Sequence, residues 1–230
     1  MKVSKRMEAI ASLVSENTIF ADIGTDHGYL PIYLCLTQKI QTAYACDVAK
    51  KPLEKAIENS KLHGVSTQIT PLLGSGFSEL RDLPIDSAVI AGMGGMLMVD
   101  IIKNDLGIVQ ALKELIVSPH HDLPVVRKYL HEIGFAITKE LMILDDGKYY
   151  TIVHAIPQKE VYDKEIFYTY GKYLLEEKNP LLLEKLLYEE AKTKALLLKL
   201  QNTPHEVSEA MTTTKTKLQE IKEAMTWFAK

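Results

Sequence analysis

The chain has 230 residues, of which 47% are hydrophobic, and its formal net charge is -3. This length can bury one full α/β core and a smaller second unit. The negative balance excludes binding to a polyanion through overall charge, so any nucleic-acid site must be a local basic patch. No apolar segment approaches the length of a membrane span, and we expect a soluble protein without a membrane partner.

The two cysteines, Cys35 and Cys46, lie inside apolar runs and lack the spacing of a metal site. We expect reduced thiols and a cytoplasmic location. The neighbouring His120 and His121 fall on a loop where adjacent side chains point in different directions, and the sequence offers no evident third ligand. No metal is therefore expected.

From Thr18 to Ile156, short β-rich apolar runs alternate with helical stretches, which is typical of a parallel sheet covered on both faces. Proline and glycine mark the ends of two helices, one from about Pro52 to Gly64 and another from about Pro124 to Gly134. The pattern predicts strands at residues 18–24, 42–48, 68–74, 87–93 and 114–119.

Two longer β-rich runs, residues 135–144 and 149–156, are joined by a tight turn that contains Gly147. They predict an antiparallel hairpin that closes the sheet. A mostly parallel α/β sheet with such a terminal hairpin resembles the Rossmann-like methyltransferase fold more than the six-strand dehydrogenase fold.

After Pro157 the composition shifts to Lys, Glu and Leu, as expected for helices. Steps of three and four residues define two stripes, separated by Asn202, Thr203, Pro204 and His205. These stripes predict an antiparallel hairpin of coiled-coil type, with its core at Leu182, Leu186, Glu189, Thr193, Leu196 and Leu200 and at Val207, Met211, Thr214, Leu218, Ile221, Met225 and Phe228.

The segment from Phe20 to Pro31 carries the most chemical information. An apolar strand ends in Asp22 and turns through Gly24 and Gly28, where open α/β sheets bind their ligands. The GxGxxG pattern of dinucleotide folds is absent, and Asp26 would repel a diphosphate but favour a ligand with an amine or a sulfonium. A plain strand-to-helix turn remains the alternative interpretation.

Other strand ends carry candidate ligand groups. Asp47 lies 25 residues after Asp22, close to the spacing at which an acidic residue binds ribose hydroxyls, although it could equally cap a helix. Ser75, between two glycines, either borders an adenine ring or forms a simple turn. The glycine-rich residues 92–95 leave room for the close approach of a flat group.

Four segments together resemble the bacterial tRNA (adenine-22, N1)-methyltransferase family: ADIGTDHGYLP, IAGMGG, the early Ser4-Lys5-Arg6 and the late Gly147-Lys148-Tyr149-Tyr150. The resemblance covers the whole chain. It implies a Rossmann-like methyltransferase domain over residues 1–157, a helical coiled-coil hairpin over residues 158–230, S-adenosylmethionine as the cofactor and tRNA as the substrate. We expect a monomer or weak homodimer.

Pattern and resemblance together assign cofactor binding to Asp22, Gly24, Thr25, Asp26, His27, Gly28, Asp47, Ser75, Gly92, Met93, Gly94 and Gly95. Two departures concern this assignment. The family commonly has Asp at the position of Ser75, which bears on the adenine contact. It commonly has Gln-Pro at Ser118-Pro119, which bears on substrate orientation.

Asp26 is the expected catalytic residue, because a carboxylate beside the target adenine would stabilise the charge that develops there. The expected RNA contacts are Lys5, Arg6, Arg127 and Lys128, with further lysines on the hairpin at Lys192, Lys194, Lys199, Lys215 and Lys217. Two alternatives stay open: a methyltransferase of the same fold that acts on a small molecule or protein, and a nucleotide-binding module without catalysis.

Overall fold

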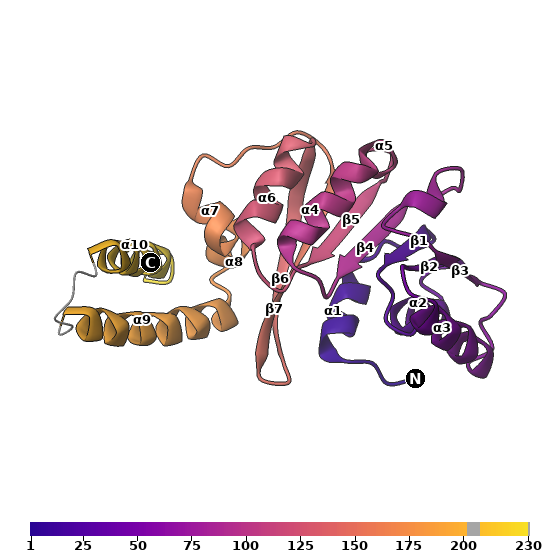
Figure 1. The fold of residues 1–230 in the computed structure, drawn as a ribbon, viewed down its shortest axis with the longest axis horizontal. Helices are drawn as coiled ribbons and strands as arrows, with labels where there is room; N and C mark the ends of the chain where they lie inside the picture. Colours follow the sequence, from indigo (N-terminus) through magenta and orange to yellow (C-terminus); the bar gives the residue numbers. More distant parts are fainter. Residues whose placement is uncertain (202–207, 230) are drawn as a thin grey trace. The chain divides into compact units, whose positions relative to one another are not determined.

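The structure is a computed structural model that describes residues 1–201 and 208–229. The chain divides into two compact units, Met1–Val161 and Tyr162–Lys230 (Figure 1). The predicted boundary after residue 157 lies close to this division. The assignment of a separate function to each unit stays a prediction.

The first unit is built on a seven-stranded sheet with the order β3-β2-β1-β4-β5-β7-β6. Strands β1 to β5 pair in parallel, and β7 pairs antiparallel with both β5 and β6. This topology confirms the predicted Rossmann-like methyltransferase fold. The strands are β1 (Ile19–Ile23), β2 (Thr42–Asp47), β3 (Ile69–Leu73), β4 (Ser87–Ala91), β5 (Glu114–Ser118), β6 (Phe135–Asp145) and β7 (Lys148–Pro157).

The β6–β7 hairpin has a two-residue turn at Asp146 and Gly147. Both residues have positive φ, 48° and 71°, as a type I′ turn requires. An Asp-Gly pair adopts these angles at low cost, because glycine lacks a Cβ and Asp tolerates the left-handed region. The turn pairs Asp145 with Lys148 and fixes the register of the two strands.

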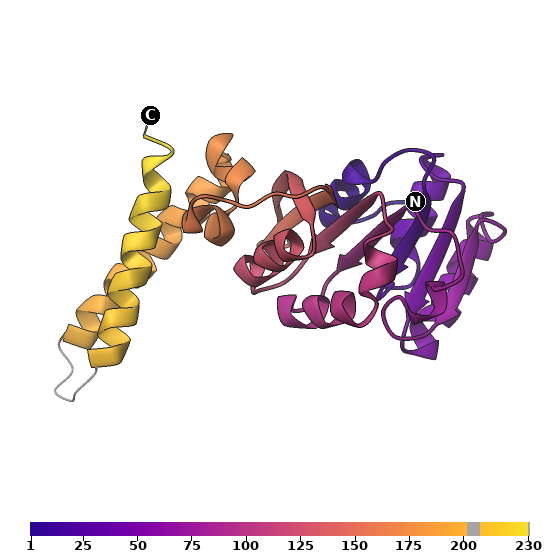
Figure 2. The same ribbon diagram turned by 90° about the horizontal axis from the view of Figure 1, so that it is seen from above.

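Helices cover the sheet in two layers (Figures 1 and 2). In the first layer, α1 packs on α2 and α2 packs on α3; in the second, α4 packs on α5 and α6. Their bounds are α1 (Lys5–Leu13), α2 (Tyr29–Leu36), α3 (Lys50–Leu62), α4 (Gly95–Asn104), α5 (Leu106–Val109) and α6 (Leu123–Glu132), with a short 3₁₀ helix η1 (Ser78–Leu80). Pro52 and Pro124 lie in first turns, and Gly64 and Gly134 follow the last, as predicted.

Buried aliphatic and aromatic side chains fill the space between sheet and helices, among them Phe20, Val89 and Ile116. All five residues of β5 are buried, as expected for a central strand with both faces covered. Cys35 and Cys46 are buried and unpaired, and burial raises their pKa values to about 11 and about 12. Both side chains are therefore thiols at neutral pH.

The second unit is helical, with α7 (Glu165–Tyr170), α8 (Lys172–Glu176), α9 (Pro180–Gln201) and α10 (Ser208–Thr226). Helices α9 and α10 pack on each other, with Leu186 and Ile221 fully buried. Leu196, predicted to lie in the core, is 48% exposed, because two helices enclose only a narrow stripe between them. The predicted turn at Asn202 to His205 and the predicted core residue Val207 lie outside the described residues.

Supercoiling of the two long helices stays a prediction. Among the helices that the structure describes, none combines the length and the apolar character needed to cross a membrane.

Candidate cofactor site

The chain after β1 bends over the end of β2, because the backbone N–H groups of Gly24 and Thr25 both donate to the carbonyl oxygen of Cys46 at 2.9 Å. Gly24 has a φ of 77°, and a Cβ at this position would lie 2.0 Å from Cε of Met93. The left-handed backbone favours glycine here, and the Met93 side chain of the loop after β4 packs against it.

Asp22 lies at the base of this edge and is 7% exposed. Burial raises the pKa of its carboxyl to about 6, against the lowering effect of a 2.6 Å hydrogen bond from Oγ1 of Thr25. The nearby Asp26 and Asp47 raise this pKa further. Three carboxylates at one sheet edge create an environment that favours a cationic ligand.

Asp26 and His27 form the exposed part of the β1 loop. The Asp26 side chain is 74% exposed, and its Oδ1 lies 3.7 Å from Nε2 of His27. His27 has a positive φ of 57°, and its carbonyl oxygen accepts a hydrogen bond from Nδ2 of Asn59. The loop therefore presents the Asp26 carboxylate to solvent above the buried Asp22.

Gly28 is required by packing within the protein. Its φ is 71°, and a Cβ at this position would lie 2.8 Å from Cβ of Ala56. The glycine brings the start of α2 close to α3. A direct contact of Gly28 with the cofactor stays a prediction.

At the end of β2, Oδ1 of Asp47 accepts a 2.7 Å hydrogen bond from the backbone N–H of Ala49, the residue before α3. This bond orders the turn before α3 but is not a helix cap, because the N-cap residue of α3 is Ala49 and α3 has no side-chain capping hydrogen bond. The Asp47 carbonyl oxygen accepts from the N–H of Gly74, which draws the loop of Ser75 to the same edge. Ser75 is exposed on that loop. The ribose and adenine assignments of Asp47 and Ser75 stay proposals.

The loop after β4 needs its glycines for the segment that follows β5. A Cβ on Gly94 would lie 2.7 Å from Cε1 of His121, and one on Gly95 would lie 2.7 Å from the His121 carbonyl oxygen. The group that closely approaches Gly94 and Gly95 is therefore His121 of the protein itself. His121 also pairs with the carboxylate of Asp122.

Arg6 joins this edge from α1. A small cavity of ≈ 40 Å³ is lined by Arg6, Met7, Ile10, Asp22, Gly24, Asp26, Leu30 and Ala91. The Arg6 guanidinium lies over the ring of Tyr150, with Cζ 5.0 Å from the ring centre. The structure thus brings the predicted RNA contact Arg6 together with the predicted cofactor residues. Lys5 lies beside it and is exposed.

The comparisons with known proteins decide the family. Residues 3–153 match the model described as "Methyltransferase domain". The chain belongs to this methyltransferase family.

Whole-length similarities extend the family assignment to the second unit. The methyltransferase is 28% identical to the tRNA (adenine(22)-N(1))-methyltransferase of Bacillus subtilis over 98% of this chain and 94% of that protein. It is 30% identical to a Streptococcus pneumoniae protein solved in complex with S-adenosyl-L-methionine, with a TM-score of 0.88 and coverage of 97% and 100%. It is 27% identical to M. capricolum TrmK solved with S-adenosyl-homocysteine, with a TM-score of 0.87 and 99% coverage of each chain.

One predicted substrate residue of the methyltransferase is corrected by the structure. The Arg127 side chain is 1% exposed and pairs with the buried Glu140, so it does not lie on a surface that RNA could reach. The reason is its position on the face of α6 that covers the sheet. The adjacent Lys128 is exposed and keeps its predicted role as a proposal.

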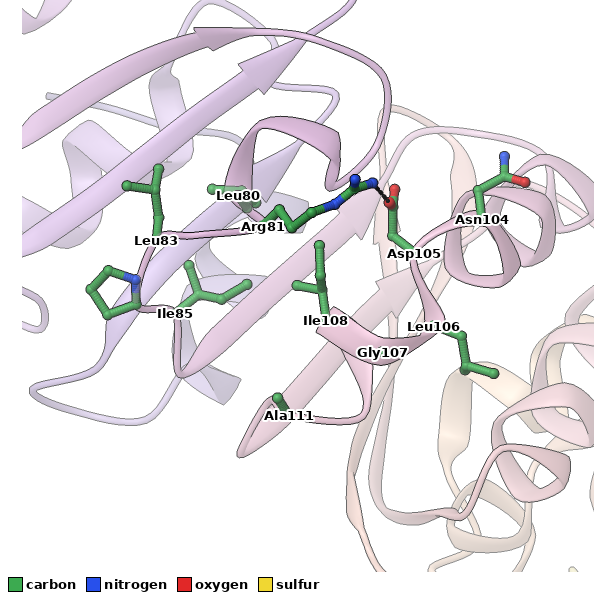
Figure 3. A pocket seen from close by; sticks show the side chains of 11 residues that line it. Leu80, Arg81, Leu83, Ile85, Asn104, Asp105, Leu106, Gly107, Ile108 and Ala111 are labelled. Atoms are coloured by element: carbon green, nitrogen blue, oxygen red, sulfur yellow. Dashed lines mark ion pairs between the residues drawn. The ribbon is translucent and has the colours of Figure 1, made fainter.

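A larger cavity of ≈ 610 Å³ lies elsewhere in the methyltransferase, between the segment before β4 and the end of α4 (Figure 3). Its lining combines aliphatic side chains with an ion pair, in which Nη2 of Arg81 lies 3.8 Å from Oδ1 of Asp105. Ile85 on its wall precedes β4, whereas the cofactor residues follow the strands. The cavity is therefore at the opposite end of β4 from the candidate site.

Two residues near the site were not assigned from sequence. The rings of His120 and Tyr150 lie 6.2 Å apart, beside Arg6. The sequence offered signals for both, because Tyr150 belongs to a segment that carries the family resemblance and His120 follows a departure from it. Within residues 1–201 and 208–229, no group of three or more His, Cys, Asp or Glu side chains could hold a metal ion.

Proposed function

We propose that this methyltransferase transfers a methyl group from S-adenosylmethionine to N1 of adenine 22 in tRNA. The observation that carries the proposal is the similarity to the B. subtilis tRNA (adenine(22)-N(1))-methyltransferase, which extends over 98% of this chain. The similarity includes the helical second unit. A methyltransferase that consists of the sheet unit alone would not match this part of the chain.

The chemistry of the sheet edge fits the cofactor. S-adenosylmethionine carries two positive charges, on its sulfonium and its α-amine, and a ribose with two hydroxyls. Asp22 and Asp26 supply negative charge beside the Arg6 cavity, and Asp47 lies at the end of the neighbouring strand. A carboxylate binds a ribose hydroxyl pair through charge-assisted hydrogen bonds, which contribute about 1.5 to 3 kcal/mol each.

The reaction itself needs alignment more than activation. N1 of neutral adenine has a free lone pair, which forms the new N–C bond while the bond from the methyl carbon to sulfur breaks. Positioning of the two groups can lower the barrier by roughly 7 to 11 kcal/mol. The positive charge passes from sulfur to the adenine, where the exposed Asp26 carboxylate would stabilise it.

Binding of tRNA requires local basic surface, since the chain as a whole has a net charge of -3. Lys5, Arg6 and Lys128 in the first unit are the proposed contacts near the chemistry. On the hairpin, Lys194 pairs with Glu190 at 2.7 Å, and Lys217 lies 3.3 Å from the Tyr170 hydroxyl. The exposed Lys192 and Lys199, one heptad apart on α9, are further proposed phosphate contacts.

We further propose that the protein acts in the cytoplasm, as a monomer or weak homodimer. The two buried, unpaired thiols are consistent with a reducing compartment. Sedimentation at several protein concentrations measures the oligomeric state, and a stable higher oligomer would contradict this proposal.

The function is tested by incubating the protein with labelled S-adenosylmethionine and total bacterial tRNA, followed by digestion and separation of the nucleosides. Labelled 1-methyladenosine is the expected product. Cofactor binding without transfer would favour a nucleotide-binding module. If the label appears in a small molecule or protein and the RNA stays unlabelled, the chain is a methyltransferase of the same fold with a different substrate.

A further inference from the structure

Three side chains from distant parts of the sequence form a cluster beside the candidate cofactor site. The Arg6 guanidinium lies over the Tyr150 ring at 5.0 Å, and the His120 ring centre lies 6.2 Å from that of Tyr150. The planes of the two rings are inclined at 56°. Arg6 comes from α1, Tyr150 from β7 and His120 from the segment after β5. Cofactor binding alone does not explain why these three side chains lie together.

The backbone holds this cluster in place. The His120 N–H donates to the carbonyl oxygen of Met93 at 2.8 Å, which ties it to the glycine-rich loop after β4. Tyr150 pairs with Ile143 in the β6–β7 hairpin. The Arg6 N–H donates to Oδ2 of Asp145 at 3.2 Å, near the end of the same hairpin. The cluster is therefore held by the backbone at three points, two of them in the β6–β7 hairpin and one in the loop after β4.

The cluster also adjoins the residues expected around the methyl group. Nη2 of Arg6 lies 3.3 Å from the position that a Cβ on Gly92 would take, and Arg6 shares a cavity with Asp22 and Asp26. A group that replaced the Arg6 guanidinium on Tyr150 would thus lie beside the Gly92 backbone, at the sheet edge where the proposed cofactor binds.

We infer that Tyr150 is the surface on which the target adenine stacks, and that His120 meets the edge of that base. The inference rests on the proposed function. Tyr150 is half-buried, so that one part of its ring is packed and another faces outward, and His120 is exposed. The Arg6 guanidinium, a flat cation, already lies against the ring, so the ring accepts a planar group. When the base binds, the Arg6 guanidinium would leave the Tyr150 ring and contact the RNA backbone instead.

The chemistry of the substrate requires such a surface. An adenine inside folded RNA has to leave its stack before its N1 can reach a methyl donor, and enzymes that modify bases restore part of the lost stacking with aromatic side chains. Because the His120 ring is tilted relative to Tyr150, it cannot stack on the same base in parallel. Its ring nitrogens would instead face the edge of the base.

The test compares Tyr150→Phe and Tyr150→Leu in the full-length protein with tRNA as substrate. Phenylalanine keeps the flat ring, so Tyr150→Phe should keep kcat close to that of the wild type. Leucine removes the ring, and kcat should fall by about ten- to a hundredfold, the range of one base–aromatic stack. KM for tRNA should change little, since phosphate contacts supply most of the affinity.

Two measurements separate a stacking role from a structural one. The dissociation constant for S-adenosylmethionine and the melting temperature should be the same in Tyr150→Leu and the wild type. Tyr149→Leu is the matched control, because the neighbouring residue of β7 points to the opposite face of the strand. This variant should keep the wild-type kcat.

A second readout does not depend on turnover. In tRNA with 2-aminopurine at position 22, fluorescence rises when the base leaves the RNA stack and is quenched when it stacks on an aromatic ring. Tyr150→Leu should therefore give a brighter complex than the wild type. If the wild type methylates tRNA but Tyr150→Leu has unchanged kcat and unchanged fluorescence, the inference is wrong while the proposed function stands. If the wild type methylates no tRNA, the proposed function itself fails.

Discussion

Arg127 and Glu140 form an ion pair inside the first unit, with Nε 2.8 Å from Oε1 and side chains that are 1% and 0% exposed. One partner comes from α6 and the other from β6, so the pair links the helix layer to the hairpin at the edge of the sheet. The positive charge of Arg127 thus serves the fold.

This relationship predicts a large loss of stability in Arg127→Met. The change leaves the Glu140 carboxylate buried without its cation, which costs about 3 to 5 kcal/mol. The double variant Arg127→Met with Glu140→Leu removes both charges and should recover most of that loss. Urea unfolding of the three proteins measures the free energies. If the single variant is as stable as the wild type, the pair contributes nothing.

The raised pKa of Asp22 predicts a pH-dependent stability in the cofactor-free protein. The pKa of this carboxyl is 3.8 in the unfolded chain and about 6 in the folded one. Between these values the folded state holds a proton that the unfolded chain has released. The free energy of unfolding therefore falls as pH rises through this window, by roughly 3 kcal/mol at most.

Asp22→Asn removes this titration, so the variant should gain stability relative to the wild type between pH 4.5 and pH 7. Other titrating groups, including Glu114, are present in both proteins, so their contributions to the pH dependence cancel in the comparison. Burial would raise the pKa of Glu114, but hydrogen bonds from His154, Ser15 and Ser87 hold it at about 2. A stability difference that does not change with pH would contradict the prediction.

Two variants of Asp47 separate its role in the turn before α3 from the proposed ribose role. Asp47→Ala removes the acceptor for the Ala49 N–H and should cost about 1 kcal/mol of stability. If Asp47 also binds ribose hydroxyls, S-adenosylmethionine should bind about ten- to a hundredfold more weakly. Asp47→Asn can keep the hydrogen bond to Ala49 but lacks the charge, so it should lose affinity without losing stability. Unchanged calorimetric affinity in both variants would leave only the role in the turn.

Asp26→Asn tests the proposed catalytic residue. A neutral amide cannot stabilise the positive charge that develops on adenine, so kcat at saturating cofactor should fall on the order of a hundredfold. Asp82→Asn, which alters an exposed carboxyl in the loop before β4, is the control. If saturating cofactor restores the rate of Asp26→Asn, the carboxylate only binds cofactor.

The hairpin lysines are tested by the double variant Lys192→Gln with Lys199→Gln. Each lost phosphate contact should lower the slope of log affinity against log salt concentration by about 0.7 to 0.9. Binding of S-adenosylmethionine should be unaffected, and Lys61→Gln on α3 is a matched control. A full salt slope in the double variant would point away from RNA binding by this face of α9.

Much of the fold could be predicted from sequence because the signals are local. The apolar runs that end at Asp22 and Asp47 became β1 and β2 within a residue or two, and Gly147 marked the hairpin turn. These assignments depend on neighbouring residues alone. The order of the strands in the sheet was not predicted, because it depends on contacts between segments that are distant in the sequence.

Features that depend on distant contacts were not predictable. Arg127 and Lys128 are adjacent basic residues, and only the packing of α6 shows that the first is buried and the second exposed. The need for Gly95 arises from the carbonyl oxygen of His121, 26 residues later, which would lie 2.7 Å from a Cβ at this position. The exposure of Leu196 likewise depends on how much of α9 its partner helix covers.

Methylation at N1 of adenine 22 can be tested with two tRNA transcripts, one with adenine and one with guanine at position 22, incubated with the protein and S-adenosylmethionine. A methyl group on N1 blocks base pairing, so reverse transcription stops at the modified base. We expect a stop at position 22 of the first transcript and none in the second. Equal methylation of both transcripts, or a stop at another adenine, would contradict it.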